Sequence, residues 1–69
     1  MDTRTEAEDF LTENLEGLER ALRAGDERGA RINREGYFKG IAEYAELLPE
    51  STRARLYQRQ IKIIRENGN

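Results

Sequence analysis

The sequence predicts an all-α protein: an antiparallel helical hairpin followed by a shorter third helix, packed together as a small helical bundle. Three segments repeat apolar residues at spacings of three and four, which places them on one face of a helix. Short turn signals separate these segments, first Gly25-Asp26 and then Pro49. No segment alternates apolar and polar residues as a half-buried strand would. We expect residues 1–69 to form a single domain.

The first helix is expected at about residues 4–24. Thr3 or Thr5 starts it, because each is followed three residues later by a glutamate, as in a capping box. Its buried stripe consists of four leucines at spacings of four, three and four, namely Leu11, Leu15, Leu18 and Leu22. Gly25 is expected to end the helix in the left-handed conformation. Because the connection is so short, the second helix should fold back antiparallel to the first.

The second helix is expected at about residues 26–47, with Asp26 as its cap. Its apolar stripe consists of Ala30, Tyr37, Ile41, Ala45 and Leu48, flanked by Phe38 and Tyr44. Arg34 falls on this stripe, so a break near Asn33 is an alternative.

Three glycines share one edge of the second helix, within about 40° of one another on the helical wheel. They are Gly29, Gly36 and Gly40. Each glycine costs a helix roughly 1 kcal/mol relative to alanine. Either they allow another helix backbone to approach closely, or they mark a loosened segment near Asn33.

The third helix is expected at about residues 50–66, after Pro49. Its apolar face is centred on Tyr57, Ile61 and Ile64, with Leu56 and Ile63 on one side. The opposite face carries Arg55, Arg59 and Lys62. Residues 1–24 hold seven acidic and three basic residues, a net charge of -4, whereas residues 49–69 hold two and five, a net charge of +3. We therefore expect the first and third helices to face each other, within one chain or across a dimer.

Little catalytic chemistry is expected of this chain. It contains no Cys and no His, which excludes disulfides, the ordinary zinc sites and the commonest catalytic bases and thiol nucleophiles. Ser51 lies at a helix start and is expected to act as a cap. The neighbouring carboxylates are expected to be solvated surface residues, namely Glu43 with Glu46, and the row Glu6, Asp9 and Glu13. We therefore expect no enzymatic activity, no cofactor and no metal.

Partner binding is the expected function. A core this small rarely supplies more than roughly 3–5 kcal/mol without a disulfide, a metal or a partner. We therefore expect a homo-oligomer, preferably a homodimer, that also binds another protein. The candidate partner-binding residues are Gly36, Tyr37, Gly40, Tyr44, Arg55, Tyr57, Arg59 and Lys62.

Nucleic-acid binding through the basic third helix is the competing expectation. A sequence pI of about 5.2 disfavours it, because nucleic-acid-binding modules are usually basic overall. No membrane association is expected, because no apolar stretch approaches the length of a spanning helix. The acidic N-terminal stretch does not read as a signal peptide, and a cytoplasmic location is expected.

A resemblance to known proteins lies in the stretch "GIAEYAELLPESTRARLYQRQIKIIRE". Ile41-Ala42-Glu43-Tyr44, then Leu47-Leu48-Pro49-Glu50, then an Arg-rich amphipathic helix resemble the small helical accessory proteins encoded in the early regions of lambdoid phages. The same segment is also similar to the theta subunit of bacterial DNA polymerase III, over less than half of the chain and outside residues 1–30. The phage resemblance implies host takeover or lysis–lysogeny regulation through protein contacts in the host cytoplasm, without catalysis. Neither resemblance assigns site residues.

Overall fold

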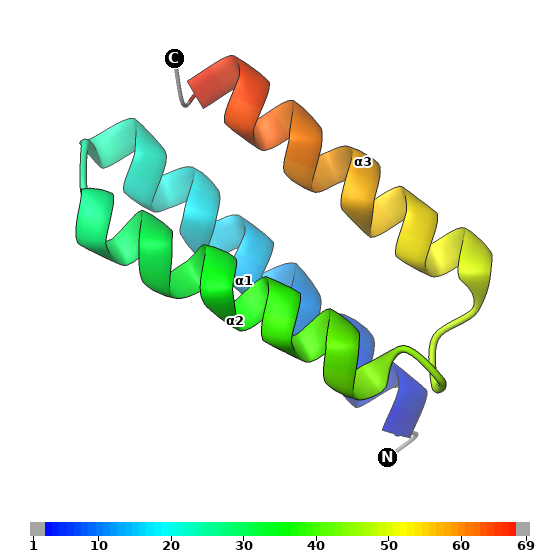
Figure 1. The fold of residues 1–69 in the computed structure, drawn as a ribbon. Helices are drawn as coiled ribbons and strands as arrows, with labels where there is room; N and C mark the ends of the chain where they lie inside the picture. The colour runs from blue at the N-terminus through cyan, green and yellow to red at the C-terminus, as the bar shows by residue number, and fades with distance from the viewer. Residues whose placement is uncertain (1–2, 68–69) are drawn as a thin grey trace.

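The computed structural model describes residues 3–67, which form the helices α1 (Thr3–Ala24), α2 (Glu27–Tyr44) and α3 (Glu50–Asn67). Helix α1 lies against both other helices, whereas α2 and α3 make only marginal contact with each other. Figure 1 shows α1 behind α2 and α3, with α2 antiparallel to both of its neighbours. The prediction of three helices without strands is confirmed for the described residues. Helices α2 and α3 each contain 18 residues, so the third helix is not the shorter one.

The turn between α1 and α2 follows from its two residues. Gly25 has a φ of 73°, the left-handed conformation that favours glycine. Its amide donates to the carbonyl of Leu22 at 3.2 Å, and the Asp26 amide donates to that of Ala21 at 2.8 Å, the pair of bonds that defines a Schellman motif. Asp26 also begins α2, because its Oδ1 accepts a hydrogen bond from the Gly29 amide at 2.9 Å. The predicted stop and cap are both confirmed.

Helix α2 ends at Tyr44, three residues before the end expected from the sequence. The Leu47 amide donates to the Tyr44 carbonyl at 3.0 Å, which tightens the chain into a turn. Pro49 then supplies the cap of α3, because its carbonyl accepts from the Arg53 amide at 3.1 Å. Ser51, expected as a cap, instead lies inside the first turn of α3.

The core lies along α1 and draws on all three helices. The leucine stripe of α1 is its centre, and Leu11, Leu15 and Leu18 are at most 1% exposed. The other large buried side chains are Tyr37 of α2, Leu48 of the second turn, and Leu56 and Ile63 of α3. Only one face of each outer helix therefore packs on α1, which leaves a side of the bundle open.

Gly36 and Gly40 allow α1 to approach α2 closely. A Cβ on Gly40 would lie 2.7 Å from Leu11 Cδ2 and 2.8 Å from Phe10 Cε1, well inside ordinary contact distance. A Cβ on Gly36 would overlap the side-chain oxygen of Asn14. The expectation that another helix packs on this edge holds for these two glycines, and that helix is α1 of the same chain, whose side chains lie against them.

A glycine of α1 also lies close to a side chain of α2. A Cβ on Gly17 would overlap the side-chain oxygen of Asn33. Asn33 also donates from Nδ2 to the Gly29 carbonyl at 2.8 Å, and α2 continues through it, so the alternative of a break there is wrong. Gly29 has a different role from the other two glycines of α2. A Cβ there would overlap the carboxylate of Asp26, which caps the helix.

Helix α3 is rotated relative to the expected apolar face. Its buried residues are Leu56, Gln60 and Ile63, whereas Tyr57 is 51% exposed. Ile61 and Ile64, expected at the centre of the face, are only partly buried. The rotation places Tyr57 beside the gap between α2 and α3.

Candidate functional site

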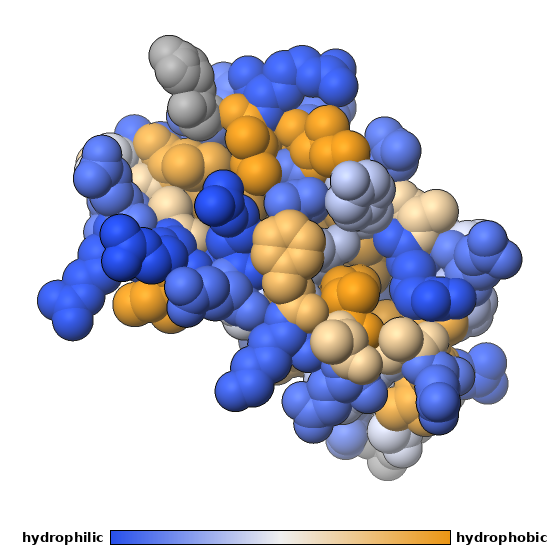
Figure 2. All heavy atoms as spheres, in the orientation of Figure 1, coloured by the Kyte–Doolittle hydropathy of each residue, from blue (hydrophilic) through white to orange (hydrophobic). Residues whose placement is uncertain are grey.

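A shallow groove lies between α2 and α3, and α1 lines part of it. One hollow of about 460 Å³ is lined by Tyr37, Phe38, Ile41, Glu50, Arg53, Ala54 and Tyr57. A second hollow of about 340 Å³ lies nearer the start of α2 and is lined by Leu18, Leu22, Glu27, Ala30, Arg31, Arg34 and Ile64. Figure 2 shows apolar side chains along the space between the two helices, with polar ones around them. We refer to these two hollows together as the groove.

Two aromatic side chains stand across the groove from each other. Phe38 of α2 is 47% exposed and Tyr57 of α3 is 51% exposed. Beneath them lies Tyr37, which is 1% exposed and packs edge-on against Phe38 with ring centroids 5.3 Å apart. Burial raises the pKa of the Tyr37 hydroxyl, and the nearby Tyr57 raises it further. The hollow therefore has a fixed aromatic floor and two half-exposed aromatic walls.

The groove also carries three arginines. Arg31 and Arg34 line one hollow, and Arg53 lines the other. The Nε atom of Arg53 is buried and has no hydrogen-bond partner. Among residues 3–67, no hydrogen bond or ion pair involves the side chain of any of these three arginines.

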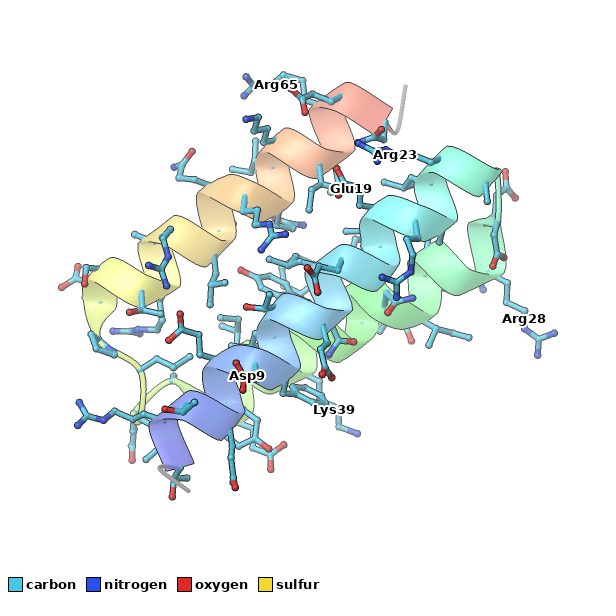
Figure 3. All side chains as sticks on the ribbon, turned by 180° about the vertical axis from the view of Figure 1, so that it is seen from behind. Asp9, Glu19, Arg23, Arg28, Lys39 and Arg65 are labelled. Atoms are coloured by element: carbon cyan, nitrogen blue, oxygen red, sulfur yellow. The ribbon has the colours of Figure 1, made fainter. Side chains whose placement is uncertain are left out.

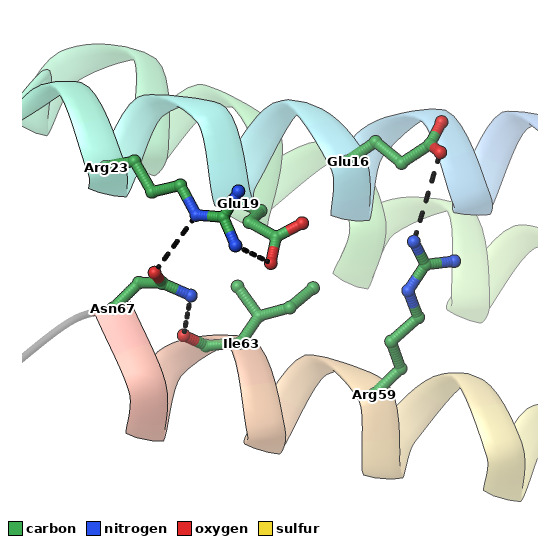
Figure 4. A network of polar contacts seen from close by, with 6 residues as sticks. All are labelled: Glu16, Glu19, Arg23, Arg59, Ile63 and Asn67. Carbon is green, nitrogen blue, oxygen red and sulfur yellow. Dashed lines mark hydrogen bonds and ion pairs between the residues drawn. The ribbon is translucent and has the colours of Figure 1, made fainter.

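Two arginines on another face of α3 form ion pairs with glutamates of α1. Arg55 Nη2 donates to Glu8 Oε1 at 2.5 Å, and Arg59 Nη2 lies 3.9 Å from Glu16 Oε2. At the end of the bundle, Arg23 of α1 contacts Glu19 and also donates to the side-chain oxygen of Asn67 at 3.3 Å (Figure 4). The expected attraction between the acidic first helix and the basic third helix therefore acts within one chain.

The predicted partner-binding residues fall into three groups. Gly36, Gly40 and Tyr44 lie between α1 and α2, where the Tyr44 ring meets Phe10 edge-on at 6.0 Å. Arg55 and Arg59 make the ion pairs with α1. Tyr37 and Tyr57 line the groove, whereas Lys62 is exposed and does not line it.

Phe38, Arg34 and Arg53 line the groove but are not among the predicted partner-binding residues. In the sequence, Phe38 flanks the apolar stripe of the second helix, and Arg34 interrupts that stripe. Arg34 was the sequence signal that could have indicated this surface, because it is an arginine on an otherwise apolar helical face. It lies at the border of the groove and does not break the helix.

The carboxylates considered in the sequence are all exposed, namely Glu6, Asp9, Glu13, Glu43 and Glu46. In the described part of the chain, no three acidic residues are grouped so that they could hold a metal ion. The face opposite the groove is strongly charged, and its labelled residues Arg28, Lys39 and Arg65 point away from the bundle (Figure 3). Within residues 3–67, no helix has both the length and the apolar character to cross a bilayer.

Comparison with protein-family models, with curated proteins and with solved structures gives no match. The class of protein is therefore defined by the fold and the groove alone. It is a small all-α bundle with one open, partly apolar side. The resemblance to phage accessory proteins stays a prediction.

Proposed function

We propose that this chain is a non-catalytic interaction protein that binds a helix of a partner protein in the groove between α2 and α3. The observation that carries the proposal is the pair of half-exposed aromatic side chains, Phe38 and Tyr57, on either side of an open hollow. Aromatic residues are enriched among the side chains that dominate binding energy. A groove with two helical walls is the surface that an amphipathic helix fills in helix-in-groove recognition.

Binding a helix in the groove would give the bundle a fourth member.

The partner helix must cover more of the groove than Phe38 and Tyr57. Phe38 and Tyr57 each leave roughly 100 Å² to bury, since an aromatic side chain buries about 150–250 Å² in full. At about 25 cal/mol per Å², the two together contribute roughly 5 kcal/mol. Association costs an estimated 4–15 kcal/mol, so the aromatic walls alone do not support tight binding. The partner helix must also cover the apolar side chains Ile41 and Ala54, which line the same hollow.

Nucleic-acid binding through α3 is the weaker proposal. Arg55 and Arg59 would have to leave Glu8 and Glu16 before they could contact phosphates. In the proposed function the protein acts in the cytoplasm and regulates its partner, as the resemblance to phage accessory proteins also implies.

Site-specific photo-crosslinking tests the proposal even though the partner is unidentified. A photoreactive phenylalanine analogue is placed at Phe38 in one variant and at Ile32 in a matched control. Both side chains lie on α2 and are exposed, at 47% and 60%, but Ile32 does not line the groove.

After irradiation in bacterial cells, we expect a discrete protein adduct from position 38 and none from position 32. Equal labelling from both positions, or no adduct from position 38, would contradict the proposal. An adduct with a second copy of this chain would keep the groove as a docking surface and make the expected homodimer its occupant.

A further inference from the structure

We infer that the helix bound in the groove is acidic, with two carboxylates about two turns apart, one directed at Arg34 and one at Arg53. This inference rests on the proposed function and adds the chemistry of the partner. It follows from the charge and the spacing of the groove residues.

The lining of the groove carries one more positive than negative charge, because Arg31, Arg34 and Glu27 line one hollow and Arg53 and Glu50 line the other. The two glutamates lie at the starts of α2 and α3. Glu27 and Glu50 are therefore at opposite ends of the groove, whereas Arg34 and Arg53 are nearer its middle. Among residues 3–67 no carboxylate pairs with either of these arginines. Covering them with an apolar helix would desolvate cations without a partner, which is costly.

The spacing of the two arginines follows from helix geometry. Phe38 and Tyr57 line the same hollow from opposite helices, and we infer that they face each other across it. Arg34 precedes Phe38 by four residues and Arg53 precedes Tyr57 by four, each a displacement of about 6 Å along its own helix. Because α2 and α3 run antiparallel, the two displacements are in opposite directions. Arg34 and Arg53 are therefore about 12 Å apart along the groove and on opposite walls.

That spacing defines a pattern in the partner. A distance of 12 Å corresponds to about eight residues of helix, and residues i and i+8 lie about 80° apart on the wheel. Carboxylates at these two positions would straddle a central residue at i+4, which lies midway between them. The residue at i+4 would then sit between Phe38 and Tyr57 and is expected to be large and apolar.

A second copy of this chain fits the groove less well than such a helix. Facing two grooves brings together two surfaces that each contain three arginines and two glutamates. Each surface has a surplus of one positive charge, and bringing two such surpluses together opposes association. The outer face of α1 is acidic, but it carries no apolar stripe that could fill the groove, since Leu11, Leu15 and Leu18 are buried in the core.

Two designed helical peptides test the inference with the full chain. Both carry leucine at i+4 and at the adjoining positions of the same face. One has glutamate at i and i+8, and the other has lysine there. Binding of the fluorescein-labelled peptides is measured by anisotropy at about 0.15 M salt, where the Debye length is about 8 Å and long-range effects of net charge are screened.

We expect the glutamate peptide to bind at least about tenfold more tightly than the lysine peptide, which corresponds to about 1.4 kcal/mol. Arg34→Glu combined with Arg53→Glu should reverse the preference. A matched pair, Arg28→Glu with Arg65→Glu, makes the same change in net charge on side chains that point away from the bundle and should leave the preference unchanged.

Three outcomes would overturn the inference: no preference between the peptides, an equal response to both pairs of substitutions, or no binding of either peptide. Sedimentation of the chain alone provides a fourth. A dimer that Phe38→Glu converts to a monomer would show that a second copy occupies the groove. In that case the groove would remain a docking surface, because the crosslink from position 38 would still form, and only the acidic partner would be excluded.

Discussion

Replacing Gly40 by alanine tests the close packing of α1 on α2 through the sign of the stability change. At a solvent-exposed helical position, Gly→Ala stabilises by about 1 kcal/mol through helix propensity. At Gly40 the new methyl group would lie 2.7 Å from Leu11 and 2.8 Å from Phe10. Ordinary carbon contacts are about 3.5–4.0 Å, so the neighbours must retreat by roughly 1 Å.

Leu11 cannot retreat easily, because it is 0% exposed at the centre of the core. Overpacking of this kind typically costs about 1–3 kcal/mol. After the gain in propensity of about 1 kcal/mol, the variant is expected to be between neutral and about 2 kcal/mol less stable. A loss of about 1 kcal/mol would lower Tm by about 4–8 °C in a domain of this size.

Urea unfolding followed by circular dichroism at about 222 nm, the helical band, provides the measurement. Ala42→Gly, at an exposed position of the same helix, measures the propensity contribution separately. Stabilisation of Gly40→Ala by about 1 kcal/mol, equal and opposite to the effect of Ala42→Gly, would refute the close-packing account.

Three further substitutions test other parts of the structure. Asp26→Ala removes the acceptor for the Gly29 amide and should cost about 1 kcal/mol in urea unfolding, and no loss would contradict the cap. Arg55→Ala breaks the exposed ion pair with Glu8 and should cost less than about 1 kcal/mol, decreasing with added salt, so a large salt-independent loss would be inconsistent with this assignment. The raised pKa of Tyr37 means that the unfolded chain releases its proton first, at a pKa near 10.0. The stability that the neutral Tyr37 hydroxyl contributes is therefore fully present below about pH 10 and is lost as the pH rises above it. In chemical unfolding, the free energy of unfolding of Tyr37→Phe should decrease less with pH above about 10 than that of the native chain. An unchanged dependence on pH would contradict burial as the cause of the raised pKa.

The turn between α1 and α2 could be predicted from the sequence because the chemistry of its two residues determines it. Gly25 is needed where the backbone turns left-handed, and Asp26 supplies a side-chain acceptor one residue later. The leucine stripe of α1 was equally predictable, because α1 is the central helix and its apolar face is unambiguous. Such features depend on a few adjacent residues or on one strong periodicity.

The orientation of α3 could not be predicted from its own periodicity. The most apolar face, centred on Tyr57 and Ile61, competes with the face of Leu56 and Ile63 for contact with α1. The ion pairs of Arg55 and Arg59 with α1 accompany the second orientation. This choice between two faces depends on a neighbouring helix, and a single helical wheel carries no information about it.

The candidate site was predicted only in part for the same reason. Tyr37 and Tyr57 were among the proposed binding residues, and both line the groove. Gly36 and Gly40 were correctly interpreted as a surface for a second helix, but the sequence did not show that α1 itself would occupy it. The groove is created by the near absence of contact between α2 and α3, which is a property of the assembled fold.

The groove is tested most directly by locating bound peptide on the folded chain with NMR. Amide and aromatic chemical shifts are recorded while the glutamate peptide is titrated into isotope-labelled protein. We predict that the perturbed signals belong to Phe38, Tyr57 and their neighbours on the facing sides of α2 and α3. Perturbations centred on the outer face of α1, around Glu13 and Arg20, or spread evenly over the bundle, would contradict the groove as the docking surface.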